Sequence, residues 1–480
     1  MGSRLGLGEG RSGVAINNLF LKNYLDLRNL ALMEESPTPM NAMPILDDIY
    51  NAFNPMPLPA GAPQYVDFRS VRGGSDVLIE LGQKVRRSSE PTCQLFSGHL
   101  GGGKSTELLK LAADLKSKGF TVVYFSADDD DINTEDVEYA DILLACTRHL
   151  LEVVKEADPK PILGWLRDRW EILADVMQTK LEFPETSIEA QVSQFAKITS
   201  KIRTQKTQRA ELRAKLNPYT EDLVSALNQF IAEAKQRLPK DRNKLLVIAD
   251  GLEKIQYISQ DDGRSNHDEI FITKAPQLKS LDCHVIYTMP VSLALSTRAS
   301  DLMDIYGCSP DVLPMVEIKC RRGVERLEGM DKMRELLASR IKVVRGAETL
   351  KLERDVFEDA ETLALLCRMT GGHVRNLVIL MQYTIDYQDQ LPLKRRSVEL
   401  AVRKMRRTYR ESVNAAADEW ELLAKVSREK IAPNDDRFRS LLFRRCILQY
   451  LDDEGKVWHD IHPLLEGSDE LQAVLRGITT

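Results

Sequence analysis

Residues 98–106 read Gly98-His99-Leu100-Gly101-Gly102-Gly103-Lys104-Ser105-Thr106, and this stretch decides the fold. Residues 93–96 before it predict a buried strand, and residues 107–115 after it carry the continuous apolar stripe of a helix. Glycines let successive backbone N–H groups point inward without Cβ atoms in the way. The N-terminus of the following helix adds partial positive charge. The stretch therefore predicts a phosphate-binding loop between a strand and a helix.

The last residues of this loop have distinct expected roles. Lys104 is expected to reach the β- and γ-phosphates of a nucleotide, and the Ser105 hydroxyl is expected to be a ligand of Mg²⁺. The alternative is a chance match to the G-x-x-x-x-G-K-[ST] pattern within an ordinary strand–turn–helix unit. The coincidence of strand, glycine-rich loop and helix favours nucleotide binding.

Length and composition limit the class of protein. A chain of 480 residues exceeds one compact core and predicts two to four domains. The formal net charge of -6 excludes a uniformly basic nucleic-acid coat, although local basic patches are compatible with it. Its seven cysteines form no C-x-x-C pair, which is typical of reduced thiols in a cytoplasmic protein. No stretch has the ~18 uncharged apolar residues of a membrane helix, and no secretory signal pattern is present, so no membrane partner is expected.

Residues 1–60 are expected to be a poorly ordered segment and a linker. A short amphipathic helix is predicted over 44–53, and the prolines between 55 and 63 predict an extended linker into the first domain. Because Met33, Met40 and Met43 follow closely, it is open whether residues 1–32 belong to the native protein.

A second motif follows in residues 244–253, Lys-Leu-Leu-Val-Ile-Ala-Asp-Gly-Leu-Glu. The apolar strand ends in Asp250, where a carboxylate would emerge beside the phosphate-binding loop on the Mg²⁺ side. Glu253, three residues on, is predicted to hold the attacking water as a general base. A buried strand that ends in Asp is common by itself, but its position after the glycine-rich loop indicates nucleotide hydrolysis.

Two interpretations remain open for each of three further candidate residues or turns. Thr288 ends a predicted strand over 284–290 and either reports the γ-phosphate or has no role. Arg375 follows the Gly371-Gly372 break and either reaches a bound triphosphate from a second domain or decorates a helix. The turn at Arg72-Gly73 either places backbone beside an adenine ring or simply begins a helix.

Charged stretches are interpreted as solvated faces with nucleic-acid contact as the alternative. A helical insertion over about 158–240 has a basic run from Lys197 to Lys215, and residues 397–410 form a basic helix. The acidic cluster Asp128–Asp131 predicts a solvated loop rather than a metal site. A last strand is predicted over 312–320, with Arg321 and Arg322 behind it more exposed than bound to phosphate.

The C-terminal third reads as helices followed by a small hairpin. Helices are predicted over 330–343, 355–369 and 373–387. A helix that passes into a strand over 438–450, a turn at 452–455 and a strand over 457–462 together suggest a winged helix. The acidic turn argues for a protein-facing role rather than insertion into a DNA groove.

Over residues 65–465 the chain resembles the AAA+-related P-loop ATPases, and within them the STAND signalling ATPases and the origin-recognition group. The motif order is the same: P-loop, Walker B strand, strand-end sensor, helical lid and winged helix. The Asp250-Gly251-Leu252-Glu253 segment looks like the STAND form. Gly371-Gly372 followed by Arg375 looks more like the sensor 2 of the origin-recognition group, and Arg72-Gly73 is similar to a reversed Gly-Arg turn near adenine.

The resemblance implies an α/β fold, a three-layer P-loop NTPase sandwich with a parallel sheet, over residues 61–325. A helical lid over 326–412 and a winged-helix-like module over 413–480 would follow. It implies ATP and Mg²⁺ as ligands, with Thr288 as sensor 1 and Arg375 as sensor 2. The implied function is a regulatory ATPase switch in signalling or defence against foreign genetic elements, with a protein partner or self-assembly on ATP binding. The alternative is an origin-recognition-like ATPase that binds or loads onto DNA.

Overall fold

The computed structural model describes residues 45–74, 76–127, 132–155, 157–169, 206–259, 264–414, 418–433 and 436–477, with isolated residues between 171 and 197. Residues 1–44, the acidic cluster Asp128–Asp131 and part of the basic run, including Lys201 and Arg203, lie outside the described residues. From Ile45 onward the chain makes one compact unit.

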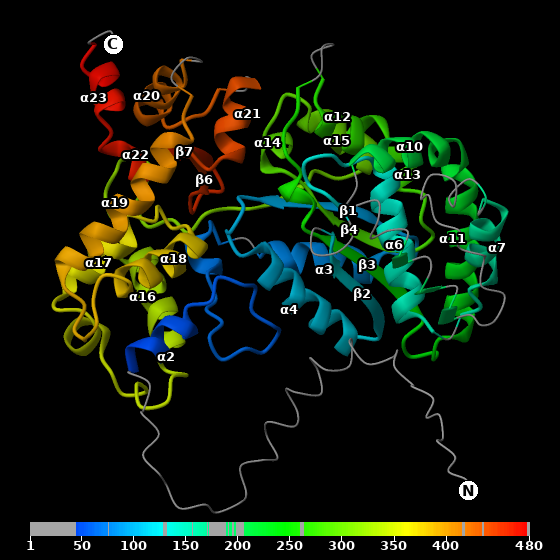
Figure 1. Cartoon of the computed structure of the whole chain (residues 1–480), viewed down its shortest axis with the longest axis horizontal. Helices are drawn as coiled ribbons and strands as arrows, with labels where there is room; N and C mark the ends of the chain where they lie inside the picture. Colours follow the sequence, from blue (N-terminus) through cyan, green and yellow to red (C-terminus); the bar gives the residue numbers. More distant parts are fainter. Residues whose placement is uncertain are drawn as a thin grey trace, which may run out of the picture. The chain divides into compact units, whose positions relative to one another are not determined.

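A parallel sheet forms the centre of this unit (Figure 1). Its strands are β1 (Cys93–Gly98), β2 (Phe120–Ser126), β3 (Lys244–Asp250), β4 (His284–Thr288) and β5 (Asp311–Leu313). The order across the sheet is β2-β3-β4-β1-β5, and every neighbouring pair is parallel. The predicted α/β class is therefore confirmed. Because β4 lies between β1 and β3, the end of β4 lies between the glycine-rich loop and Asp250.

Helices cover both faces of the sheet. The reason is visible in β3, where successive apolar side chains point to opposite faces of the sheet. Leu246 and Ile248 point into one buried cluster, whereas Leu245 and Val247 point into another. The first cluster is covered by α3 (Val77–Arg87) and α4 (Lys104–Ser117), the second by α6 (Tyr139–Val153), α7 (Lys160–Asp168), α10 (Lys206–Leu216) and α11 (Thr220–Arg237). Figure 1 shows the two groups of helices on opposite sides of the strands.

The sheet domain also contains several short helical elements. They are η1 (Arg69–Val71), η2 (Asn217–Tyr219), η3 (Leu252–Lys254), α12 (Asn266–Asp268), η4 (Glu269–Thr273), α13 (Ala275–Leu278), α14 (Val291–Ala294) and α15 (Ala299–Tyr306).

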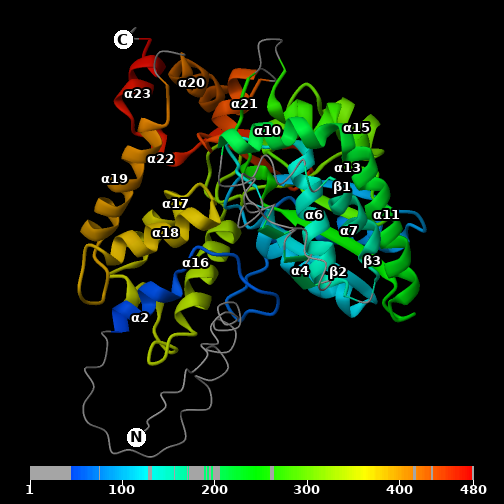
Figure 2. The ribbon, with the colours of Figure 1, turned by 45° about the vertical axis from the view of Figure 1, so that its right-hand side comes forward.

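A group of helices, here called the lid, follows the sheet domain, and Figure 2 shows these helices together. It contains α16 (Leu327–Ile341), η5 (Leu352–Val356), α17 (Ala360–Arg368), α18 (Val374–Ile385) and α19 (Arg395–Glu411). The predicted continuous helix over 355–369 is wrong, because η5 ends at Val356 and α17 begins only after extended Asp359, which caps it by accepting from the Thr362 N–H. The N-terminal helix α2 (Ile45–Ala52) packs on α16 and α18.

The C-terminal module pairs two strands in a hairpin surrounded by helices. Its elements are α20 (Glu419–Glu429), α21 (Asp436–Phe443), β6 (Ile447–Leu451), β7 (Val457–Ile461), α22 (Pro463–Glu466) and α23 (Asp469–Leu475). The hairpin register joins Ile447 to Ile461, and the Asp452 carboxylate accepts from two backbone N–H groups of the turn. The expected hairpin is thus present, with its acidic turn.

The strand predicted over 312–320 is mostly wrong. Only Asp311–Leu313 pairs with β1. Pro314 has no N–H to continue the ladder, and the next residues bond elsewhere: the Met315 N–H donates to the Gln449 carbonyl and the Glu317 N–H donates to the Val71 carbonyl. The chain after β5 therefore joins the sheet domain to the hairpin.

The junction of α17 and α18 generates a stability prediction. Gly372 has φ +79°, and an added Cβ would lie 1.9 Å from the Val316 carbonyl oxygen. We expect Gly372→Ala to lower the free energy of unfolding by more than about 3 kcal/mol in urea denaturation, because a clash adds to the left-handed strain. Gly307→Ala is the control, since Gly307 has φ +71° and open space around it. We expect it to lose only about 1–2 kcal/mol; equal losses would contradict the close approach to Val316.

Candidate functional site

The glycine-rich loop has the backbone conformation that the sequence predicts. Gly98, Gly101 and Gly103 have φ of +141°, +83° and +106°, values that other residues rarely adopt. A Cβ on Gly98 would also lie 2.7 Å from the Leu313 carbonyl oxygen. Gly103 is the N-cap of α4, and no side chain caps this helix. The first N–H groups of α4 are therefore available to an anion.

Asp250 lies at the end of β3 and contacts the loop. Its carboxylate accepts hydrogen bonds from the Tyr124 hydroxyl at 2.7 Å, from the Gly251 N–H at 2.8 Å and from the Ser105 hydroxyl. Burial and repulsion by Glu253 raise the pKa of Asp250 to about 6. The two residues predicted to hold Mg²⁺, Ser105 and Asp250, are thus brought together.

Glu253 and Lys104 form a buried ion pair, with 3.2 Å between the Nζ and Oε1 atoms. Lys104 also donates to the carbonyls of Gly98 at 2.9 Å and His99 at 3.0 Å. Burial alone would raise the pKa of Glu253, but the Lys104 charge and the Thr288 hydroxyl hydrogen bond bring it below its ordinary value. The other carboxylate oxygen, Oε2, is buried without a hydrogen-bond partner among the described residues.

Thr288 occupies the position between the two motifs. It is fully buried at the end of β4, and its hydroxyl accepts from the Leu252 N–H at 2.9 Å while it hydrogen-bonds Glu253. The geometry therefore connects Thr288 to the Walker B turn and, through Glu253, to Lys104.

The lid contacts the outer side of the loop. The His373 ring donates from Nε2 to the Leu100 carbonyl at 2.7 Å, and the Arg375 N–H donates to the Gly101 carbonyl at 3.1 Å. A Cβ on Gly101 would lie 2.6 Å from the His373 ring, so this glycine permits the approach. The Gly371-Gly372 break therefore places Arg375 directly beside the loop.

His99 and Gly73, predicted to bind the nucleotide, face the hairpin instead. His99 is buried, and its Nε2 accepts from the Gln449 N–H at 2.9 Å; burial and the Lys104 charge lower its pKa to about 3, which keeps the ring neutral. Gly73 has φ +73°, and a Cβ there would lie 2.6 Å from the Leu451 side chain. Like Gly98, neither residue lines the cavity described next.

A cavity lies over the loop. Residues 100–107, Glu253 and Arg375 of α18 are part of its lining. The lining also includes a mainly apolar set: Pro55, Met56, Pro57, Leu58, Gln64, Tyr65, Val66, Phe68, Leu336, Val374 and Val378. Residues 55–58 of the segment expected to be a linker are thus part of the site.

Two buried arginines, which the sequence did not single out as a pair, also line the cavity. Arg72 donates from Nη2 to the Gly102 carbonyl at 2.6 Å, and Arg340 of α16 bonds backbone carbonyls of residues 52 and 54. Burial lowers the pKa of both. Within the described ranges neither has a carboxylate at ion-pair distance, and the Nε atom of each is unpartnered. The charges of Glu107 and Asp67 partly oppose the lowering of the pKa of Arg72, whereas no acidic group does so at Arg340. A buried cation without a counter-charge, such as Arg340, favours an anionic ligand.

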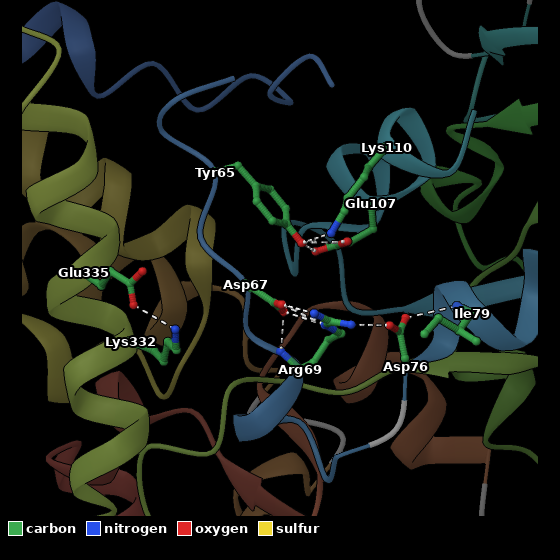
Figure 3. Close-up of polar contacts among 9 residues, drawn as sticks. All are labelled: Tyr65, Asp67, Arg69, Asp76, Ile79, Glu107, Lys110, Lys332 and Glu335. Atoms are coloured by element: carbon green, nitrogen blue, oxygen red, sulfur yellow. Dashed lines mark hydrogen bonds and ion pairs between the residues drawn. The ribbon is translucent and has the colours of Figure 1, made fainter. Parts of the chain in front are cut away.

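A polar cluster fixes the wall of the cavity next to α4 (Figure 3). The Tyr65 hydroxyl donates to the Glu107 carboxylate, at 3.1 Å from Oε1, and accepts from Lys110 at 2.9 Å. Close by, Arg69 bridges Asp67 and Asp76, and Asp76 caps α3. The Asp76 cap could be predicted from sequence, whereas the contacts of Tyr65 with Glu107 and Lys110 join residues far apart in the chain.

Other charged candidates lie outside the site. Arg209 and Arg213 from the basic run are buried and paired with Asp136, and Arg213 also pairs with Asp141. The described residues contain no cluster of three or more His, Cys, Asp or Glu side chains placed to hold a metal. Among them there is also no helix with the length and apolarity needed to cross a membrane.

Comparison with known proteins finds similarity of fold alone. No family model and no curated protein sequence matches the chain. Solved structures with a similar arrangement include a Walker-type ATPase of Pyrococcus abyssi, with 11% identity over 88% of this chain and 99% of that chain and a TM-score of 0.40. They also include the ORC1 protein of Aeropyrum pernix in complex with DNA (14% identity, 89% and 98% covered, TM-score 0.37) and CDC6P from Pyrobaculum aerophilum (12%, 89% and 97%, 0.35).

The raised pKa of Asp250 gives a prediction about stability. Because its pKa of about 6 exceeds the ordinary 3.8, ionisation of Asp250 destabilises the folded state as pH rises from about 4 to 6. In metal-free buffer we expect Asp250→Asn to raise the free energy of unfolding by about 1–3 kcal/mol at pH 7.5, and to show a smaller gain at pH 4.5. Chemical denaturation at both pH values measures this. A loss of stability at pH 7.5 would contradict the described burial of the charge.

Proposed function

We propose that the protein is an ATP-binding and ATP-hydrolysing regulatory switch of the AAA+-related type. The observation that supports this most is the convergence of Lys104, Ser105, Asp250 and Glu253 at the N-terminus of α4. A glycine-rich loop, a base and a pair of metal-ligating oxygens are the parts that phosphoryl transfer to water requires.

The loop and its cations would bind the triphosphate. The uncapped N–H groups at the start of α4 and the Lys104 ammonium would hold the phosphates, and Arg375 would approach from the lid. Arg72 and Arg340, both buried in the cavity lining, would add positive potential. The apolar residues of the lining suit a nucleobase.

Ser105 and Asp250 fit a magnesium ion. A hydroxyl bonded to a carboxylate supplies the oxygen ligands that Mg²⁺ prefers. The raised pKa of Asp250 also means that a cation beside it would relieve an unfavourable buried charge. Mg²⁺ bound here would neutralise charge on the phosphates.

Glu253 is placed to act as the base. Its lowered pKa keeps the carboxylate ionised at neutral pH, and the buried Oε2 atom is able to accept a proton from water. In the structure the Lys104 ammonium neutralises the Glu253 carboxylate. Bound phosphates would compete for the lysine, and the carboxylate would then become more basic. Thr288, bonded to Glu253, would orient it.

The same contacts would make the site a switch. The lid touches the loop through His373 and Arg375, and the hairpin touches it through Gln449. A movement of the loop on nucleotide binding or hydrolysis would therefore change the contacts of both parts. Such a switch would serve the signalling role that the STAND resemblance implies.

The central test separates binding from hydrolysis. We expect Lys104→Ala to weaken Mg·ATP binding by about 100-fold or more in calorimetry, because the phosphates lose a buried cation. Glu253→Gln should retain binding and lower the rate of phosphate release by about 100-fold or more. Lys118→Ala, an exposed lysine at the end of α4, is the control and should change neither. Normal turnover of Glu253→Gln would overturn the assignment of the base.

A second candidate function is DNA binding, and α19 is the feature that favours it. Arg396 and Arg403 are exposed two turns apart on this helix, and neither has a carboxylate at ion-pair distance in the described chain. The basic run of the insertion supports it less, because Arg209 and Arg213 are used in buried ion pairs.

The DNA candidate has its own test. If phosphates bind this face, Arg396→Glu with Arg403→Glu should weaken duplex binding at low salt by about tenfold or more and lower the slope of affinity against salt. Arg354→Glu is a control on an exposed lid residue elsewhere. Fluorescence anisotropy with a labelled duplex measures both. Equal weakening by the control, or none at all, would argue against a specific contact by α19.

A further inference from the structure

Residues 53–58, here called the strap, cross one side of the cavity. The strap begins at Phe53, which is fully buried with Leu46 and Ile49 of α2 in the core of the lid. It ends at Leu58, whose N–H donates to the Thr106 hydroxyl in the first turn of α4, at 3.1 Å. Pro55 to Leu58 line the cavity between these two points. The strap therefore joins the lid to the phosphate-binding helix directly.

Arg340 holds the lid end of the strap. From α16 its Nη1 atom donates to the carbonyls of Ala52 at 3.0 Å and Asn54 at 2.8 Å. The side chain is buried, and no acidic side chain contributes to its pKa, which burial lowers. A neighbouring residue of α16, Ser339, donates to the Gln64 carbonyl beyond the strap. Arg340 thus binds strap backbone with a charge that lacks a carboxylate partner and lines the cavity.

The strap is too short to follow a large movement of the lid. Leu58 lies four positions after Asn54, and a chain segment of this length spans at most about 14 Å when fully extended. Three of the residues from 55 to 59 are prolines, which restrict the backbone further. While the hydrogen bonds of the strap to Arg340 and to Thr106 both hold, the lid cannot move far from α4. Wide opening of the cavity requires one of these contacts to break.

We propose that the strap is a gate on the nucleotide cavity, that Arg340 and the Thr106 hydroxyl are its two fastenings, and that bound nucleotide leaves when a fastening opens. The proposal rests on the nucleotide binding proposed above. A triphosphate in the cavity supplies the negative charge that Arg340 lacks, so nucleotide binding and strap closure stabilise each other. Arg340 is then a positioning residue that acts through the strap.

The gate predicts faster nucleotide release when a fastening is removed. Leu58→Pro deletes the N–H donated to Thr106 within an already proline-rich segment, and Pro59→Ala is the control, because Pro59 is exposed, lies outside the cavity lining and leaves this N–H in place. Arg340→Met deletes the other fastening but keeps an unbranched apolar stem, and Arg334→Met is its control on the same helix, where Arg334 pairs with exposed Asp331. Dissociation of a fluorescent N-methylanthraniloyl ATP is followed after addition of excess unlabelled ATP with Mg²⁺.

We expect Leu58→Pro and Arg340→Met each to release the probe about tenfold faster or more than the wild type, with both controls within about twofold of it. Hydrogen exchange of peptides that span 53–60 shows whether the strap is loosened. Faster exchange of the strap with an unchanged release rate in Leu58→Pro would overturn the gate, and this holds even if Arg340→Met fails to fold. Absence of probe binding by the wild type would instead contradict the proposed function.

Discussion

The structure depends on one buried ion pair, between the Lys104 ammonium at the start of α4 and the Glu253 carboxylate after β3. Both side chains are almost completely buried, so neither charge can be satisfied by water. The pair exists because parallel strands β1 and β3 end on the same side of the sheet, with β4 between them. The Ser105 hydroxyl, next to Lys104 in the chain, hydrogen-bonds the Asp250 carboxylate. Phosphates would replace Glu253 as the partner of Lys104, which connects ligand binding to the state of the carboxylate.

The outer side of the glycine-rich loop also makes hydrogen bonds to other parts of the protein. Carbonyls of Leu100, Gly101 and Gly102 accept from the lid and from Arg72, and His99 accepts from the hairpin. The strap adds a contact through Thr106. A loop held by the lid, the hairpin and the N-terminal segment cannot adjust to a ligand without changing those contacts. This is the physical basis for regarding the protein as a switch.

The sequence predicted the features that are local. Glycine-rich loop, Walker B strand, hairpin turn and lid helices each follow from residues close together in the chain, because backbone sterics and short-range periodicity decide them. The orientation of Arg375 beside the loop was also accessible from the Gly371-Gly372 break. Predictions that needed only the order of motifs, such as the place of Thr288, agree with the sheet topology.

The features that could not be predicted depend on contacts across long separations. Arg209 and Arg213 look like part of a solvated basic face, but acidic residues more than seventy positions earlier enclose them. His99 lies within the motif yet faces residue 449. The sequence predicts that the proline-rich segment is a linker, because proline content indicates a stiff backbone but does not show which part of the protein the segment covers. In each case a contact partner far away in the chain, rather than the residue itself, determines where the residue lies in the structure.

The central claim is that Ser105 and Asp250 converge on one metal bound to nucleotide phosphates, and Mn²⁺ in place of Mg²⁺ tests it most directly. Pulsed electron paramagnetic resonance on the protein with Mn²⁺ and ATP should show phosphorus couplings from phosphate ligands, in a site that forms only when nucleotide is present and weakens in Ser105→Ala. Tight Mn²⁺ binding that does not depend on nucleotide, or a spectrum without phosphorus coupling, would contradict the account.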